Sequence, residues 1–142
     1  MTVPVGVLGV GSMGRHHARV YHELPDARLV GVSDADPETA RSVATTYATE
    51  AVSTEELLDR AAAVSIAVPS QYHREVGIRA LESGVHALVE KPIAPTLADA
   101  TALLDAAETS DATLQIGHVE RFNPAVLAVS EFVDDLDIVG VE

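Results

Sequence analysis

Short apolar runs alternate with segments of helical periodicity along most of the chain. The runs are rich in Val, Ile, Leu and Ala, which is typical of buried strands, and the segments between them repeat apolar residues every three or four positions, which is typical of helices. The predicted strands cover residues 3–10, 27–34, 62–69, 85–90 and 112–117, with a weak one near 51–52 and a last one at 137–142. The predicted helices cover residues 12–24, 36–48, 53–61, 71–83, 96–110 and 123–135.

The helix boundaries carry their usual signals. Asp36 stands directly before Pro37, which predicts an N-cap followed by proline at the first helical position. Ser53 and Glu56 have the spacing of a capping box. Further along, Thr96 is the predicted N-cap of its helix, and Gly84 is expected to close the helix over residues 71–83.

A strand followed by a helix, repeated along the chain, predicts parallel strands joined by helical crossovers. Because the strands are apolar at nearly every position, both faces of the sheet are expected to be covered. The predicted fold class is therefore α/β, an open, doubly wound and mostly parallel sheet. Ligands of such sheets bind beyond the carboxyl ends of the strands. The candidate residues at that edge are Gly9–Gly14, Asp34, Pro69, Ser70, Glu90, Lys91, Gly117 and His118.

The segment GVGSMG, residues 9–14, fits the pattern G-x-G-x-x-G between the first strand and the first helix. In a dinucleotide site, Gly9 permits the tight turn, Gly11 lets a pyrophosphate approach the backbone, and Gly14 allows close packing of the helix. Ser12 and Met13 complete the loop and are further candidate contacts. The free amides at the helix N-terminus would face the phosphates.

Asp34 closes the second strand, 20 residues after Gly14. A carboxylate there can accept hydrogen bonds from both ribose hydroxyls of the adenosine half and would repel a 2′-phosphate, which favours NAD over NADP. Asp36 is the alternative for this role, although its position before Pro37 is explained by helix capping. Arg15 is either a phosphate neighbour or an exposed helix residue.

Lys91 is the only lysine in the chain, and the other basic residues are all arginine. An arginine cannot give up its proton, whereas a lysine can act as a general base or stabilise an alkoxide. If Lys91 is partly buried near a nicotinium ring, its pKa is expected to fall toward neutrality. Glu90 would bind a cofactor ribose or orient the lysine, and Pro92 is a candidate for a cis peptide bond. The competing interpretation is a surface lysine in a loop.

Several other polar residues near the same edge have two open interpretations. His118 would contact substrate or nicotinamide, or pack locally. Pro69 and Ser70 would line the cofactor, with Ser70 also expected as a helix cap. His73 is a candidate cofactor contact, although its place at the helix start favours packing.

Two further groups of residues are expected to have structural roles. His16, His17 and His22 lie on the first helix at a spacing that is not typical of a zinc site, so helix packing is the expected role. Arg121 and Phe122 are expected to anchor their turn to the body of the protein. No metal site is predicted.

The composition narrows the function classes. The chain has 142 residues, 47 % of them hydrophobic, which suits one domain with a core. A net charge of −13 argues against nucleic acid or an anionic membrane as a partner. There is no cysteine, no apolar run long enough to span a membrane and no basic segment typical of a signal peptide, so a cytoplasmic location is expected. The acidic balance is either an ordinary solvated surface or, as the scarcity of lysine favours, an adaptation to concentrated salt in a halophile.

Five segments together resemble the Gfo/Idh/MocA family of oxidoreductases, over the N-terminal half of a usual member. They are GVGSMGRHHA, SDADPE, VPSQYH, EKP and GHVERFNP, and EKP is the most specific. The resemblance implies an NAD(P)-dependent dehydrogenase that acts on a hydroxyl of a sugar, cyclitol or nucleotide sugar, with Lys91 as the catalytic lysine and with Gly9, Gly11, Gly14 and Asp34 holding the cofactor. The segment GHVERFNPAV is similar to members that oxidise the 3-hydroxyl of UDP-linked N-acetylhexosamines.

The resemblance also predicts the domain organisation. Residues 1–123 would form the NAD(P)-binding domain, and residues 124–142 a connecting helix and the first strand of a second α/β domain. That domain is expected to be missing from this chain. In the family it supplies an aspartate and a histidine to the active site, and it also forms the oligomer interface. The full-length protein is thus expected to be a homo-oligomer, and this chain alone to bind cofactor with little turnover. The alternative hypothesis is a non-catalytic dinucleotide-binding or sensing module, which would have no need of the lysine.

Overall fold

The computed structural model describes residues 2–133 of the chain. The strands are β1 Val3–Leu8, β2 Ala27–Ser33, β3 Ala63–Ile66, β4 His86–Val89 and β5 Leu114–Ile116. The helices are α1 Gly14–Glu23, α2 Pro37–Thr46, α3 Thr54–Arg60, α4 His73–Glu82, α5 Leu97–Thr109 and α6 Pro124–Val133, with short 3-10 turns η1 Ser70–Tyr72 and η2 Val119–Phe122. The strand predicted over residues 137–142 lies outside the described residues.

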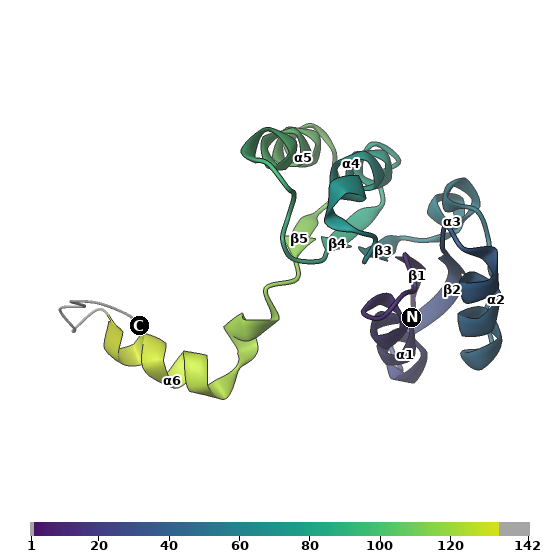
Figure 1. The fold of residues 1–142 in the computed structure, drawn as a ribbon, viewed down its shortest axis with the longest axis horizontal. Helices are drawn as coiled ribbons and strands as arrows, with labels where there is room; N and C mark the ends of the chain where they lie inside the picture. The colour runs from purple at the N-terminus through teal and green to yellow at the C-terminus, as the bar shows by residue number, and fades with distance from the viewer. Residues whose placement is uncertain (1, 134–142) are drawn as a thin grey trace.

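The five strands form one parallel sheet in the order β2-β1-β3-β4-β5. This order confirms the predicted doubly wound α/β fold, because the chain starts at the centre, crosses to β2 and then returns to build the other half. The weak strand near residues 51–52 is a single bridge between Ala51 and Val32 of β2. In Figure 1, helices α1 and α2 lie on one side of the sheet, and α4 and α5 lie on the other.

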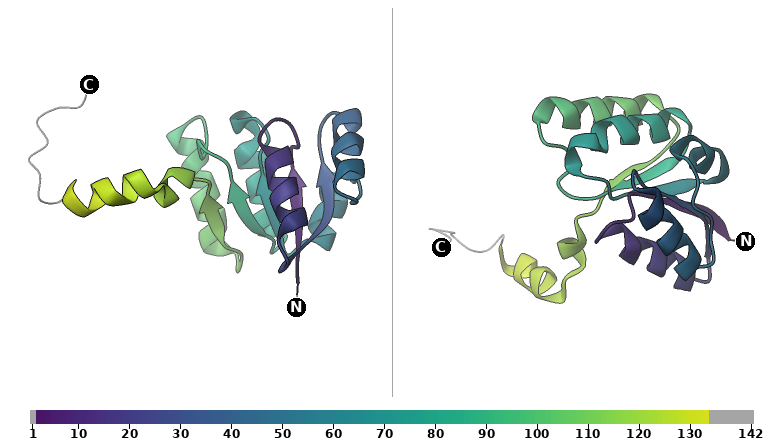
Figure 2. Two further views of the ribbon diagram at one scale, coloured as in Figure 1. Left: turned by 90° about the horizontal axis from the view of Figure 1, so that it is seen from below. Right: turned by 45° about the vertical axis from the view of Figure 1, so that its right-hand side comes forward.

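Each face of the sheet has its own hydrophobic cluster. Val7 of β1 and Val32 of β2 pack with Ala18 of α1 and with residues of α2. The next residue along β1, Leu8, packs in the second cluster with Leu57 of α3 and with residues of α4. Successive side chains of a strand point to opposite faces. The strands therefore read as continuous apolar runs because helices cover both faces, as the views in Figure 2 illustrate.

The N-caps predicted at Asp36, Ser53 and Thr96 are confirmed, although Ser53 does not form a full capping box. The pKa of Asp36 is lowered because the Thr39 hydroxyl and the Glu38 N–H both donate hydrogen bonds to its carboxylate. Ser53 Oγ accepts the Glu56 N–H at 3.1 Å, but the Glu56 carboxylate pairs with an arginine instead of completing the capping box. Two further signals are confirmed: Thr96 Oγ1 accepts the Asp99 N–H at 3.2 Å, and Gly84 has a φ of +74°.

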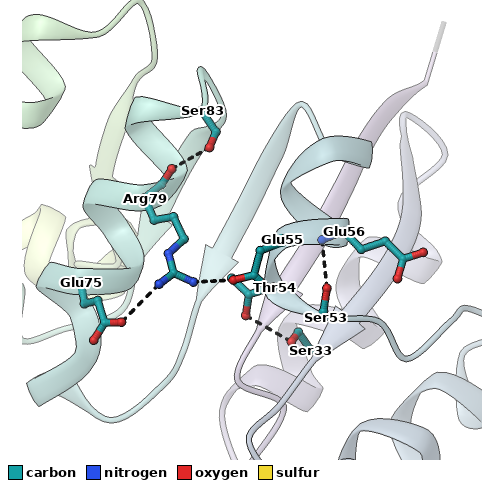
Figure 3. A network of polar contacts seen from close by, with 8 residues as sticks. All are labelled: Ser33, Ser53, Thr54, Glu55, Glu56, Glu75, Arg79 and Ser83. Atoms are coloured by element: carbon teal, nitrogen blue, oxygen red, sulfur yellow. Dashed lines mark hydrogen bonds and ion pairs between the residues drawn. The ribbon is translucent and has the colours of Figure 1, made fainter.

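Ion pairs on the surface connect neighbouring helices. In Figure 3, Arg79 of α4 donates to Glu55 of α3 at 2.7 Å and to Glu75 of its own helix at 3.4 Å. The Arg79 side chain is 45 % exposed. An exposed pair contributes only about 0.2–1 kcal/mol, so these contacts orient α3 and α4 but do not account for the stability of the fold.

Helix α6 extends away from the sheet (Figure 1). The expectation that Arg121 and Phe122 anchor the preceding turn to the body of the protein was wrong, because both are exposed and Phe122 is 72 % exposed. Among the described elements, the turn η2 makes extensive contacts with α6 alone. Within residues 2–133, every helix is too short or too polar to cross a membrane.

Candidate active site at the carboxyl edge of the sheet

The carboxyl ends of the five strands form one continuous edge. Four backbone hydrogen bonds link neighbouring strands just beyond their ends: Gly9 N–H to Ser33 O at 2.8 Å, Ala67 N–H to Leu8 O at 2.8 Å, Glu90 N–H to Ile66 O at 3.0 Å, and Gly117 N–H to Val89 O at 2.8 Å. The predicted candidates therefore meet along one line, from the glycine turn and Asp34 at one end to Lys91 and His118 at the other.

The glycine turn has the geometry that its sequence predicts. Gly9 has a φ of +82°, which an L side chain rarely adopts. Gly14 begins α1, and a Cβ added there would lie 1.8 Å from the carbonyl oxygen of Gly9. A Cβ added to Gly11, in contrast, would meet no atom within 4 Å. Gly9 and Gly14 thus leave no room for a side chain, whereas Gly11 faces open space.

The N-terminus of α1 is free to bind an anion. Its N-cap residue, Met13, makes no side-chain capping bond, and the first turn of the helix contains no acidic residue. The first amides of a helix have no acceptor within the helix and carry partial positive charge. Ser12 and Met13 are both exposed beside them. The open space at Gly11 and these amides fit the pyrophosphate of a dinucleotide.

The Asp34 carboxylate is held by the backbone around it. Its Oδ2 accepts the N–H of Val10 at 2.7 Å, and its Oδ1 accepts the N–H of Asp36 at 2.9 Å. Each carboxylate oxygen has a second lone pair, so both can still accept a ribose hydroxyl. Asp36, the alternative, uses its own carboxylate to cap α2. Asp34 and Asp36 thus each accept one hydrogen bond on either carboxylate oxygen, and the assignment of Asp34 as the ribose acceptor rests on its position at the end of β2.

The turn after β4 carries Glu90 and Lys91. The Lys91–Pro92 peptide bond is cis. Lys91 is exposed, so the expected partial burial is not found, and the argument from desolvation does not apply to the described chain. Glu90 is only 16 % exposed, and its Oε2 accepts the backbone N–H of Lys91 at 3.2 Å. The structure thus supports the orienting role that was one of two alternatives for Glu90.

His17 is a residue of this site that the sequence did not reveal. Helix packing was expected for it, but its Nε2 lies 2.9 Å from Glu90 Oε1. Its Nδ1 lies 3.0 Å from the hydroxyl of Ser65, a fully buried residue of β3. His22 does pack, against the ring of Tyr47 at 5.8 Å between centroids. Only the fold brings His17 and Glu90 together, since 73 residues separate them in the sequence.

The structure does not support His73 as a cofactor contact. The residue is 1 % exposed. Its Nε2 lies 2.8 Å from Val68 O, and its Nδ1 lies 3.0 Å from Pro92 O. His73 therefore links the segment after β3 to the segment after Lys91, which is the packing role that its position favoured.

Three other candidates lie at the edge with less restraint. Pro69 is exposed and Ser70 half-buried, both beyond β3. Ser70 is not the expected helix cap, because the chain first makes the 3-10 turn η1, whose N-cap is Pro69. His118 is exposed beyond β5, where its carbonyl accepts the Arg121 N–H at 3.0 Å. These positions leave the side chains of Ser70 and His118 accessible for ligand contacts.

Gly117, predicted to lie at this edge, has a role there that the sequence did not indicate. A Cβ added to Gly117 would lie 3.3 Å from the Glu90 carboxylate. Its lack of a side chain makes room for Glu90 between β5 and His17.

A cavity of about 340 Å³ lies between α1 and α2. It is lined by residues such as Arg15 and Asp36 but not by Lys91. That cavity is therefore not the cleft at the strand ends.

Comparison with known proteins agrees with this geometry. The sequence pattern of the oxidoreductase family with an NAD-binding Rossmann fold, Gfo/Idh/MocA, matches residues 3–118. The UDP-N-acetylglucosamine 3-dehydrogenase of Acidithiobacillus ferrooxidans is 39 % identical over 122 residues, which are 85 % of this chain and 38 % of that protein. An inositol 2-dehydrogenase of Rhizobium meliloti is 37 % identical over 145 residues, covering 100 % of this chain and 44 % of that protein.

Solved structures show the same fold. The structure of UDP-N-acetylglucosamine 3-dehydrogenase GnnA from Acidithiobacillus ferrooxidans superposes with a TM-score of 0.87 at 36 % identity, covering 94 % of this chain and 44 % of that one. A levoglucosan dehydrogenase in complex with NADH and levoglucosan superposes with a TM-score of 0.83 at 28 % identity, covering 95 % of this chain and 40 % of that one. The chain thus spans less than half the length of the relatives it matches. Its sequence and its topology show that it belongs to the Gfo/Idh/MocA oxidoreductase family, of which it carries the NAD-binding Rossmann domain.

Proposed function

We propose that the full-length protein is an NAD(P)-dependent dehydrogenase that transfers a hydride between a ring hydroxyl of a sugar, cyclitol or nucleotide sugar and the nicotinamide. The observation that carries this proposal is the position of the only lysine, Lys91, on the same sheet edge as the glycine turn and Asp34. Nucleotide binding alone has no need of an amine at that position, whereas alcohol oxidation does.

Different residues of the described chain hold different parts of the cofactor. The amides from Gly11 to Gly14 bind the pyrophosphate at the N-terminus of α1, and Asp34 accepts the hydroxyls of the adenosine ribose. Pro69 and Ser70 line the cofactor beyond β3. Glu90 is held by His17 and by the backbone N–H of Lys91, and its proposed role is to orient the lysine, with a ribose contact as the alternative.

The chemistry requires a group that takes up a proton. When bound, NAD⁺ would supply the hydride acceptor for the carbinol carbon. The hydroxyl proton must leave as the carbonyl forms, and the Lys91 amine is the proposed acceptor of that proton. In the reverse direction the ammonium group returns that proton to the alkoxide oxygen. His118, exposed beyond β5, contacts the substrate or the nicotinamide.

The narrower substrate proposal is the 3-hydroxyl of a UDP-linked N-acetylhexosamine. It is supported by the segment GHVERFNPAV and by the 39 % identity to the Acidithiobacillus enzyme. The experiment is to offer the full-length protein NAD⁺ with UDP-N-acetylglucosamine, myo-inositol or glucose 6-phosphate and to follow NADH formation. Turnover with the nucleotide sugar alone is expected. Turnover with myo-inositol but not with the nucleotide sugar would keep the dehydrogenase and reject this substrate.

The preference for NAD over NADP is proposed to rest on the charge of Asp34. An Asp34→Asn change keeps the size of the side chain and removes the charge that would repel a 2′-phosphate. Two charges at about 4 Å and an effective dielectric of 20 interact by about 4 kcal/mol, so the ratio of the Kd for NADP to the Kd for NAD should fall by at least about tenfold. Calorimetry with both cofactors measures that ratio. An unchanged ratio would assign the selectivity to another residue.

The acidic surface is proposed to be an adaptation to concentrated salt. With a net charge of −13, self-repulsion is relieved by screening, so the full-length protein should gain stability with added salt. A stabilisation of about 1 kcal/mol corresponds to a rise in Tm of about 2–4 °C for a protein of this size class. Thermal unfolding in dilute buffer and in molar KCl measures the change. A Tm that stays the same in both would favour an ordinary acidic surface.

The domain organisation is also a proposal. Residues 1–123 form the NAD(P)-binding domain, residues 124–142 lead into a substrate domain, and the full-length protein works in the cytoplasm as a homo-oligomer without nucleic acid or membrane partners. Light scattering on the purified full-length protein tests the oligomer, because a monomeric mass would contradict it.

A further inference from the structure

A chain of polar side chains crosses one face of the sheet and ends at the Lys91 turn. It starts at Tyr21 of α1, whose hydroxyl lies 2.7 Å from Ser65 Oγ of β3. Ser65 Oγ lies 3.0 Å from His17 Nδ1, and His17 Nε2 lies 2.9 Å from Glu90 Oε1. The other Glu90 oxygen accepts the backbone N–H of Lys91 at 3.2 Å. The helix that begins at the glycine turn is therefore connected to the lysine by a continuous series of hydrogen bonds.

This series of polar side chains is shielded from water. Ser65 is fully buried, and the side chains of His17 and Glu90 are 17 % and 16 % exposed. Water competes little for these groups, and a hydrogen bond is stronger where the local dielectric is low. Among the described residues, every buried side-chain nitrogen or oxygen has a hydrogen-bond partner. Removing one member would therefore leave its neighbour without a partner.

The chemistry of the partners sets the direction of the bonds. A carboxylate only accepts, so His17 Nε2 carries the hydrogen that it donates to Glu90. With a neutral ring, Nδ1 then accepts the Ser65 hydroxyl hydrogen, and Ser65 in turn accepts from Tyr21. Every group in this arrangement is satisfied. The ring of His17 is thus held on both sides, and its donor points at Glu90.

Glu90 is confined from the opposite side as well. The space beside its carboxylate exists because Gly117 has no side chain. With His17 on one side and the end of β5 on the other, the carboxylate is restrained where it accepts the Lys91 amide. A change at His17 would free Glu90 to rotate and would remove the restraint on the backbone that carries the lysine.

We propose that His17 is a positioning residue for Lys91, which acts through Glu90 and sets the lysine turn relative to the phosphate-binding helix. The inference rests on the proposed function, since it assigns a partner to the proposed catalytic amine. This positioning role does not require a direct contact between His17 and the cofactor or substrate. The expected signature is a loss of kcat with little change in cofactor binding.

Two substitutions at His17 separate its two hydrogen bonds. In a His17→Gln variant the amide nitrogen takes the place of Nε2 and can still donate to Glu90. In a His17→Asn variant the amide takes the place of Nδ1, so it can keep Ser65 but does not reach Glu90. A His16→Ala variant, one residue away on the exposed surface of the same helix, is the control.

In the full-length protein, His17→Asn is expected to lower kcat about 10- to 100-fold, because a misplacement of about 1 Å costs up to about that much. His17→Gln should restore kcat to within about threefold of the wild type, and the Kd for NAD should change by less than about threefold in both. Equal kcat values for the Asn and Gln variants, high or low, would overturn the proposal. So would an effect confined to the Kd for NAD.

The same measurements distinguish this proposal from the proposed function. If a Lys91→Met variant keeps its turnover, the dehydrogenase role of Lys91 fails and the positioning role with it. If Lys91→Met is inactive while His17→Asn is as active as the wild type, only the positioning role fails. Thermal unfolding of both His17 variants checks that they fold. If the Asn variant does not fold, a folded Gln variant whose kcat falls more than about tenfold would overturn the proposal.

Discussion

Replacing Lys91 with methionine in the full-length protein is expected to lower turnover by about 10²–10⁴-fold, the range that a general base contributes. Methionine has a similar length and no amine, so it cannot take the hydroxyl proton. The Kd for NAD should stay within about threefold, because phosphate and ribose are held by the glycine turn and Asp34. Steady-state kinetics and calorimetry on the same preparation measure the two quantities.

A Lys91→Arg variant separates the two roles that an amine could have. Arginine keeps the positive charge and cannot give up its proton. If Lys91 takes up the proton, the Arg variant should be nearly as slow as the Met variant. An Arg variant close to the wild type would show that Lys91 stabilises an alkoxide by its charge. Wild-type turnover in the Met variant would defeat the enzymatic role and leave the cofactor-binding module as the remaining hypothesis.

Substituting Gly14 with alanine is expected to destabilise the protein by about 3 kcal/mol or more, the upper part of the range for overpacking. The added Cβ would lie 1.8 Å from the oxygen and 2.8 Å from the carbon of the Gly9 carbonyl. These are backbone atoms, so no side-chain rotation can relieve the clash, and Gly9 itself is held by its φ of +82°. Unfolding in urea, followed by circular dichroism, measures the loss.

Gly11→Ala is the matched control within the same turn. Its Cβ would meet no atom within 4 Å, so stability should stay within about 0.5 kcal/mol of the wild type. The methyl group would instead occupy the space into which the pyrophosphate must fit, and the Kd for NAD should rise at least about tenfold, or about 1.4 kcal/mol. If Gly11→Ala binds NAD normally, the pyrophosphate does not lie against this turn. A stable Gly14→Ala protein would show that the turn can rearrange.

The described strands and helices follow from the local pattern, and the errors lie at their ends. A strand was predicted over residues 62–69, but β3 is Ala63–Ile66, because the chain beyond it leaves the sheet to form the edge of the site. A helix was predicted from residue 12, but α1 begins at Gly14, because residues before it form the glycine turn. In both cases the apolar pattern continues past the point where the ligand-binding edge interrupts the regular structure.

The site residues divide in the same way. Those predicted correctly as neighbours, Gly9, Asp34, Glu90 and Lys91, follow directly after a strand, and parallel strands bring their carboxyl ends to one edge. The exposure of Lys91 was not predicted, because it does not depend on position along a strand.

Strand and helix periodicity and turn chemistry act over a few residues, so the α/β fold, the glycine turn, the acid after the second strand and the lone lysine could be predicted from local patterns. The folded chain was needed to show that His17 faces Glu90, that Ser65 lies behind it, and that Gly117 makes room for the carboxylate. The residues that meet in the hydrogen bonds of His17 and Ser65 are 44 to 73 positions apart in the sequence. Such contacts are set by which helix packs over which strand, and a polar residue on a helix does not show in the sequence which partner it will meet.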